Sequence, residues 1–225
     1  MQWLVALLLF ESLLLLYAAR ANQSCTQLRN LAVVNMLCIS LFPFKFITVG
    51  PFTSNLGNLW YATVFAVQVV AYDRCGWKSS KGLLKSVYVA LFIFLGLVNL
   101  GAQVPSPPGL EGPLLQLVAD RALRVTIASL LAFGGAQLCL IKAYAWLRAQ
   151  GSSVVPCYLI AMTLGQIVDS LIFFPVAFEG WSRLVGLLLA GLALKILFGV
   201  TLIPAVYLAQ RRVNCETGLK ALITV

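Results

Sequence analysis

The chain has 225 residues, of which 61% are hydrophobic and only 10% are charged, and its mean hydropathy is +0.94. Soluble domains carry about 25% charged residues, so this composition excludes a soluble protein and predicts an integral membrane protein. The net charge of +9 comes from cations between apolar runs, which is a pattern of membrane topology and not of nucleic-acid binding. Histidine, the commonest metal ligand and general base, does not occur in the sequence, and we predict neither an enzyme nor a metal or cofactor site.

Seven apolar runs predict an all-α bundle of about seven transmembrane helices in a single polytopic domain over residues 1–225. The runs cover residues 2–19, 31–49, 59–72, 83–104, 125–147, 157–178 and 184–208. Residues 1–19 are expected to form an additional N-terminal helix, in which Glu11 has a packing or helix-pairing role. A cleaved signal peptide is the alternative, because Ala19-Arg20-Ala21 loosely resembles a cleavage site. Pro43 is expected to kink the second run.

The six cysteines stand at positions 25, 38, 75, 139, 157 and 215, without a CxxC pair. Several of them fall inside the apolar runs. We therefore expect the cysteines to act as small hydrophobic side chains and not as disulfides or zinc ligands.

The segments between the runs fall into two alternating sets, and one set is strongly basic. The cations of the basic set are Arg20, Arg29, Arg74, Lys78, Lys81, Arg148, Arg211, Arg212 and Lys220. Positive charge favours the cytoplasmic side, so we expect an inner (plasma) membrane protein with its N-terminus outside and its C-terminus in the cytoplasm. Trp60 and Tyr61 then lie at the outer end of a span, where such residues anchor helices in the interface.

The sixth run carries an amide and a carboxyl, Gln166 and Asp169, on one helix face. A carboxyl near the bilayer centre costs about 2.5–3.5 kcal/mol, so it is expected to face a partner, a cavity or a substrate. If the sixth and seventh runs form a helical hairpin, Asp169 and Lys195 both lie about 14–18 Å below the same surface, at 1.5 Å per residue. The two residues can therefore pair, either as a structural ion pair or as part of a binding site at the midplane.

Further polar groups at membrane depth are Gln68 and Gln137. Together with the ion pair, such amides suit the recognition of a flat polar molecule through hydrogen bonds to its edges. Phe65 and Phe174 could stack on its faces. Core packing of the aromatic residues and helix association through the amides are the alternatives.

The stretch LGQIVDSLIFFPVAF, residues 164–178, resembles the signature helix of the VUT family, the queuosine precursor transporters. Other segments resemble this family in the right order: LGN at 56–58 followed by DRCG at 73–76, AQ at 136–137, and a last helix with Lys195, Pro204 and Tyr207. The resemblance covers residues 31–211 and leaves residues 1–19 as an extra helix.

This resemblance implies a six-helix core that imports 7-deazaguanine bases for salvage in tRNA modification. Asn58, Gln137, Asp169 and Lys195 match the family pattern. The substrate-binding residues predicted from the pattern and the resemblance are Asp169, Lys195, Gln166, Gln137, Gln68, Asn58, Phe65 and Phe174. Val69, Leu140 and Gly191 stand where the family can have acids. The implied substrate is thus a queuosine precursor or a related purine-like small polar heterocycle.

Two other functions remain open at the level of sequence. The small size also resembles the substrate-binding membrane subunit of a vitamin importer, which would need separate ATPase subunits. A lysine midway along the last span, Lys195, is also found in seven-helix retinal photoreceptors, where it forms a Schiff base. The partners expected are the lipid bilayer and a small heterocycle, with no direct contact to nucleic acid, and the oligomeric state is left open.

Overall fold

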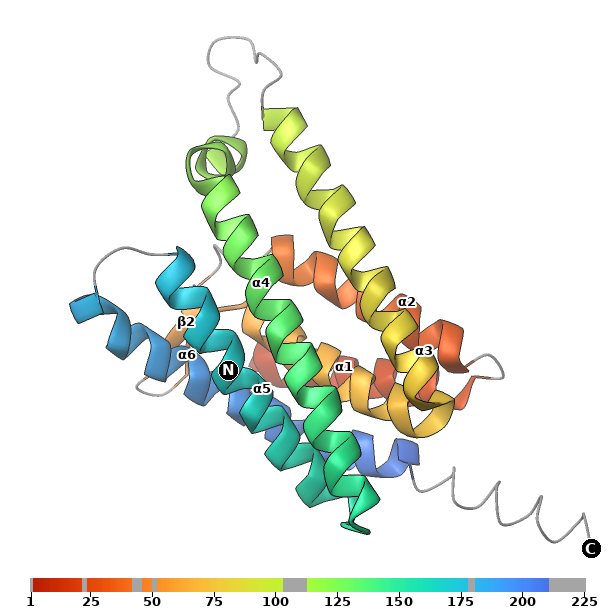
Figure 1. Ribbon diagram of the computed structural model, residues 1–225. Coiled ribbons are helices and arrows are strands. Elements are labelled where there is room, and N and C mark those ends of the chain that lie inside the picture. Colours follow the sequence, from red (N-terminus) through yellow and green to blue (C-terminus); the bar gives the residue numbers. More distant parts are fainter. Residues whose placement is uncertain are drawn as a thin grey trace, which may run out of the picture.

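The computed structural model describes residues 2–21, 24–41, 46–49, 52–102, 113–177 and 181–210. These residues form a helical bundle with one short hairpin (Figure 1). The elements in chain order are α1 (Gln2–Arg20), α2 (Ser24–Leu41), β1 (Phe46–Val49), β2 (Phe52–Asn55), α3 (Gly57–Ala102), α4 (Pro113–Ala149), α5 (Val154–Ala177) and α6 (Trp181–Thr201). The predicted all-α membrane architecture is confirmed, and the hairpin is an addition that the apolar pattern did not predict.

The long helix α3 consists of two arms that meet at Gly76. This glycine has φ 75° and ψ 176°, which breaks the helix. A Cβ at this position would find nothing within 4 Å, so the backbone conformation and not the available space requires glycine. The segment 73–81, predicted as a loop between spans, is therefore helical on both sides of a single break. Counting the two arms separately and adding the short helix Ile203–Gln210 after α6, the described residues contain eight helical segments, against seven predicted runs.

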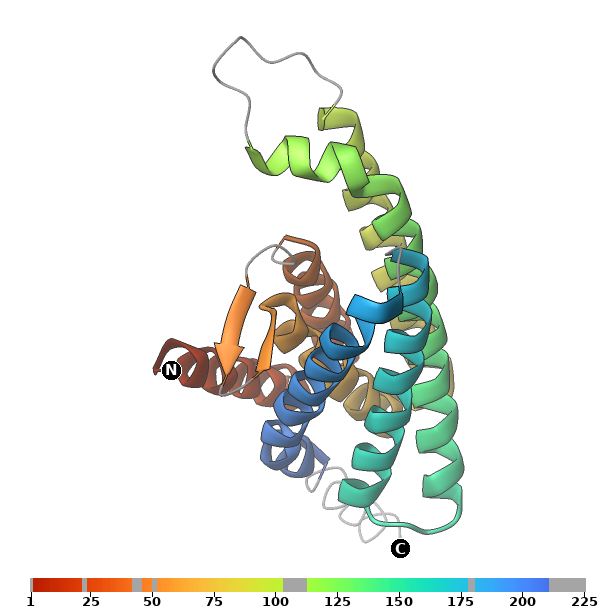
Figure 2. The same ribbon diagram turned by 90° about the vertical axis from the view of Figure 1, so that its left-hand side faces the viewer.

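Within the described residues, four helices can cross a membrane by length and composition: α1, α3, residues 127–149 of α4, and α5. A fifth span results if the helices Leu188–Thr201 and Ile203–Gln210, which meet at an angle of 41°, count as one bent span. The second arm of α3 and the first turns of α4 extend beyond the rest of the bundle (Figures 1 and 2). The chain is a multi-pass membrane protein.

The second apolar run folds differently from its prediction as one kinked helix over 31–49. Helix α2 starts earlier, at Ser24, and ends at Leu41, whereas residues 46–49 pair as a strand with β2. Pro43 itself lies outside the described residues. A proline disfavours the helical conformation of the residue before it, and Ile47, Thr48 and Val49 have β-branched side chains that suit a strand. Strand β2 lies beside α6 (Figure 2).

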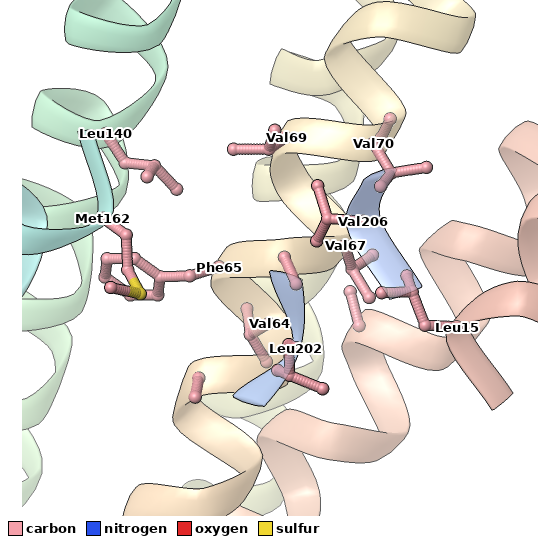
Figure 3. Packing of buried hydrophobic residues seen from close by; sticks show 14 of the residues in the cluster. Leu15, Val64, Phe65, Val67, Val69, Val70, Leu140, Met162, Leu202 and Val206 are labelled. Atoms are coloured by element: carbon pink, nitrogen blue, oxygen red, sulfur yellow. The ribbon is translucent and has the colours of Figure 1, made fainter. Parts of the chain in front are cut away.

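The first arm of α3 is the centre of the molecule. Every residue from 57 to 71 is buried, so this helix is enclosed on all sides. Phe65 points toward Met162 of α5, while Val67 and Val70 lie on the side of Leu15 in α1 (Figure 3). The arm thus separates the α4–α5 side of the bundle from the α1–α2 side.

A disulfide joins Cys25, near the start of α2, to Cys75, directly before the break in α3. The prediction that the cysteines act only as small hydrophobic side chains is wrong for this pair. Because the two residues are 50 positions apart in sequence, spacing gave no signal of their contact. Cys38, Cys139 and Cys157 are free, as expected for apolar side chains.

Candidate substrate-binding site at a buried ion pair

The centre of the candidate site is an ion pair between α5 and α6. Lys195 Nζ lies 2.5 Å from Asp169 Oδ2, and both side chains are more than 90% buried. The contact agrees with the equal depths predicted for these residues along the two helices. The second oxygen of the carboxylate, Oδ1, accepts a hydrogen bond from the hydroxyl of Tyr61 in the first arm of α3. Three helices therefore meet at one carboxylate.

Groups of the protein itself balance the negative charge of Asp169. Removing a carboxylate and an ammonium from water costs several kcal/mol for each ion, and mutual attraction offsets this cost only when further hydrogen bonds complete the geometry. Tyr61 supplies such a bond, and its ring also lies 4.8 Å from Lys195 Nζ, as in a cation–π contact. Each oxygen of Asp169 accepts one of these donors, so a ligand that binds Asp169 can replace Tyr61 or Lys195 or use the lone pairs that remain on the carboxylate.

Two fully buried glutamines in the adjoining helices have no hydrogen-bond partner. Gln137 of α4 and Gln166 of α5 are both 0% exposed, and neither the nitrogen nor the oxygen of either amide is paired. The hydroxyl of Ser170, beside Asp169, is also buried and unpaired. Buried polar groups are nearly always satisfied in folded proteins, and unpaired ones indicate a missing ligand or water. These groups provide two amide nitrogens with four N–H donors, two amide oxygens as acceptors, and a hydroxyl for a polar molecule.

Close contact between α4 and α5 holds the two glutamines in place. A Cβ on Gly165 would lie 3.1 Å from the carbonyl oxygen of Ala136 and 2.5 Å from Cε1 of Phe65. A Cβ on Gly135 would lie 2.7 Å from Cδ1 of Ile172. Glycine at these positions lets the backbones of α4 and α5 approach closely. Gln166 directly follows Gly165, and Gln137 directly follows Ala136, so both glutamines lie at this helix crossing.

Two aromatic rings lie close to Tyr61, whose hydroxyl donates to Asp169. The Tyr61 ring is 5.3 Å from that of Phe65 and 6.1 Å from that of Phe133, centroid to centroid. Of the predicted stacking residues, Phe65 is thus placed next to Tyr61. Phe174 is buried and packs edge-on against Phe173 at 5.5 Å. On α5, however, Phe173 and not Phe174 stands four residues after Asp169 and shares its face.

The structure places the other two predicted site residues differently. Asn58 is buried at the start of α3, three residues before Tyr61, and so belongs to the same face as Tyr61. Gln68, two helical turns after Tyr61, donates from Nε2 to the carbonyl oxygen of Ser80 at 2.9 Å and to its hydroxyl at 2.7 Å. Gln68 thereby connects the two arms of α3, and this contact favours the alternative that it acts in helix association.

A second polar network joins α3, α4 and the short helix Ile203–Gln210, which follows α6, at the basic end of the bundle. Tyr144 donates to Oδ2 of Asp73 at 2.6 Å, Gln210 donates to the Tyr144 hydroxyl at 3.1 Å, and Arg148 lies 3.8 Å from Asp73. Arg74 donates to the carbonyl of Ala209 at 2.7 Å. Asp73 and Tyr144 follow Tyr61 and Gln137 by about 10–18 Å along their helices, at 1.5 Å per residue, and Gln210 comes after Lys195 beyond the end of α6. The network therefore closes the bundle between the ion pair and the basic surface.

Tyr61 is the site residue that sequence reasoning missed. It was expected in the membrane interface together with Trp60, yet the two side chains are only 7% and 8% exposed. Its spacing of three residues from Asn58 was the available signal, because this spacing puts both on one helix face.

A multi-pass helical bundle with a buried ion pair and unpaired amides at the meeting point of its helices has the properties of a small-molecule membrane transporter. Residues 55–209 match the model of the family described as "Putative vitamin uptake transporter". The chain belongs to this family, the VUT family, which agrees with the resemblance of its signature helix. No curated protein and no solved structure matches the chain.

Proposed function

We propose that this transporter imports a purine-like heterocycle, with 7-deazaguanine precursors of queuosine as the first candidates, and that Asp169 is its central binding group. The observation that carries the proposal is the set of unpaired amide atoms on Gln137 and on Gln166, which stands three residues before the paired carboxylate of Asp169 on α5. A deazaguanine presents adjacent donors and acceptors along its edges, which amides and a carboxylate can complement. Phe65 provides an apolar face next to the site.

In this proposal, Lys195 and Tyr61 compensate the charge of the Asp169 carboxylate when no substrate is bound. Lys195 and Tyr61 occupy the two oxygens of Asp169 until ring N–H groups of the substrate replace one of these donors. The released lysine or tyrosine then lies beside the substrate, where it can donate to a carbonyl of the ring. Exchange of the Tyr61 hydroxyl for a substrate donor keeps the carboxylate paired with Lys195 throughout, so that neither state leaves a buried charge without a partner.

The topology proposed with this function has the N-terminus outside and the basic end of the bundle in the cytoplasm. The network of Asp73, Tyr144 and Arg148 lies at that end and would close the path to the cytoplasm. The substrate would therefore enter from the opposite end in the conformation described.

A host that cannot synthesise queuosine provides the test. Cells that express the chain are supplied with 7-cyano-7-deazaguanine, 7-aminomethyl-7-deazaguanine or queuine, and queuosine in their tRNA is measured. Wild type should restore queuosine, and Asp169→Asn should abolish the effect while remaining expressed and folded. Restoration that is equally strong in Asp169→Asn would contradict the proposed role of the ion pair. Absence of restoration by well-expressed wild type would contradict the proposed substrate.

A substrate-binding membrane subunit of a vitamin importer is a second candidate, because the description of the family names vitamin uptake. It differs from the first candidate in its need for ATPase subunits. Purified chain reconstituted alone in vesicles should accumulate or exchange substrate if it is a self-sufficient transporter. Binding without any transport in such vesicles, with transport restored by ATPase subunits from the native host, would favour the second candidate.

A further inference from the structure

A second buried polar cluster lies on the other side of the central helix, between α1, α2 and the first arm of α3. Its members are Glu11, Asn35 and Thr63, which are 3%, 1% and 1% exposed. Each comes from a different helix. The hydrogen-bonding groups that face the Glu11 carboxyl are the side chains of Thr63, Asn35 and Trp60.

Three oxygen atoms of this cluster lack a hydrogen-bond partner: Glu11 Oε2, Asn35 Oδ1 and Thr63 Oγ1. The amide nitrogen of Asn35 donates to the carbonyl of Leu31 at 2.9 Å, which leaves the amide oxygen as the atom it can offer to a ligand. A carboxylate, an amide oxygen and a hydroxyl are hard oxygen ligands of the kind that bind small cations.

The cluster also lacks a positive charge in the part of the chain that the structure describes, where no lysine or arginine pairs with Glu11. The groups that face Glu11 from α2 are Asn35 and the thiol of Cys38, and those from α3 are Trp60 and Thr63. Asp169, by contrast, is paired with Lys195. A carboxylate inside the membrane is costly without a compensating charge, so the cluster is incomplete in a way that the ion pair is not.

We propose that Glu11, Asn35 and Thr63 form a binding site for a small monovalent cation, either a proton or Na⁺, that neutralises the Glu11 carboxylate. A proton on Oε2 would donate to one of the unpaired oxygens, whereas Na⁺ would take all three as ligands. Both cations supply the same missing positive charge. The site is separate from the ion pair and is built by a helix, α1, that lies outside the part of the chain matched by the family model.

The cation site shares one element with the candidate substrate site. Trp60 and Thr63 flank Tyr61 along α3, and Tyr61 donates to Asp169. A cation that draws α1 and α2 toward this helix therefore favours one position of Tyr61 over others. This coupling, which rests on the proposed transport function, would make the cation a co-transported or driving ion.

The cation site itself can be tested without any substrate. The full chain in lipid nanodiscs is unfolded by heat, and tryptophan fluorescence reports the midpoint. One arm compares NaCl, KCl and choline chloride at pH 8 and constant ionic strength. The other arm varies the pH from 5 to 8 in choline chloride. Wild type and the near-isosteric variant Glu11→Gln are measured side by side.

If Na⁺ is the ligand, the midpoint of wild type should rise by about 5–10 °C at a concentration 100-fold above the dissociation constant. If the ligand is a proton, a rise of similar size should follow acidification and should not depend on Na⁺. In either case Glu11→Gln should not show the rise. Thr63→Val, which retains the shape of the side chain, should shift the Na⁺ titration at least tenfold to higher concentration but should leave a proton effect in place.

Equal responses of wild type and Glu11→Gln in both arms would overturn the proposed site. Because this result does not involve transport, it would leave the proposed substrate and the role of Asp169 unaffected. Conversely, a cation effect that requires Glu11 would stand even if no queuosine precursor were transported.

Discussion

The buried ammonium of Lys195 is paired with the Asp169 carboxylate, so replacing Lys195 leaves that carboxylate without a counter-charge. We expect Lys195→Met to lower the free energy of unfolding by about 3–5 kcal/mol, the usual cost of breaking a buried pair from one side. The double variant Asp169→Asn/Lys195→Met, in which neither charge remains, should recover much of this loss without recovering transport. Thermal unfolding of purified protein measures the difference, with Lys85→Met as a control because Lys85 is an exposed lysine of α3. A Lys195→Met variant as stable as the control would contradict the pairing.

The hydroxyl of Tyr61 donates to a charged acceptor, which makes its hydrogen bond stronger than that of an ordinary buried tyrosine. Tyr61→Phe should therefore cost about 1.5–3 kcal/mol of stability. Tyr158→Phe is a matched control, since the fully buried Tyr158 donates to the neutral carbonyl of Gly199 at 3.1 Å, and should cost about 1 kcal/mol. Denaturation of both variants under one condition decides the order. The prediction is wrong if Tyr158→Phe is the more destabilising change.

The residues of the ion pair were predictable because charges at membrane depth are rare and two helices of known length allow their depths to be compared. Tyr61 was not predictable in the same way, because tyrosine is common in both the interface and the core. The partner of Cys25 was equally hidden, since a contact across 50 residues leaves no trace in spacing. The sequence thus identifies polar and charged side chains at membrane depth, but not the residues that pair with them.

At the scale of elements, the approach of α4 to α5 depends on the absence of a side chain at Gly165. We expect Gly165→Ala to destabilise the protein by about 1–3 kcal/mol, because the added Cβ would lie 3.1 Å from a backbone oxygen that cannot move freely. It should also reduce substrate binding by displacing Gln166. Unfolding and binding assays on the same preparation measure both effects.

Gly96→Ala serves as the control for this prediction. Position 96 is also helical, but a Cβ there would meet nothing within 4 Å. Alanine is the better helix former, so this variant should keep or raise stability by up to about 1 kcal/mol. Equal destabilisation at both positions would point to a general effect of the substitution and against a close helix crossing.

Element boundaries followed the apolar pattern where one helix made one run, as in α5. They departed from it where local backbone chemistry intervened. A loop was predicted between two spans, but α3 continues there and is broken only at Gly76. Residues 46–49, the last part of a predicted span, form a strand of the hairpin. Hydropathy indicates whether a segment lies in an apolar environment, but not whether its backbone is helical or extended. A buried strand and a buried helix therefore look alike in a short apolar stretch.

For the whole molecule, the disulfide gives a decisive measure of orientation. Cys25 and Cys75 both belong to the basic segments, which the proposed topology places in the reducing cytoplasm. In this topology the disulfide of the structure would be reduced in cells to two free thiols, which a membrane-impermeant maleimide should label only after permeabilisation. The measurement uses a variant in which the other cysteines are replaced by alanine. An intact disulfide in cells whose disulfides form only outside the cytoplasm would reverse the orientation.

When Cys25 and Cys75 are joined, the chain between them becomes a covalent ring. The ring contains most of α2, the hairpin and the first arm of α3, and hence the tyrosine that touches Asp169. A single cut by a protease between the two strands would open the ring without separating its pieces. The central helix would then remain attached to α1 through the sulfur bridge as well as to α4 through the peptide chain, so that a nicked molecule would still migrate as one species until it is reduced.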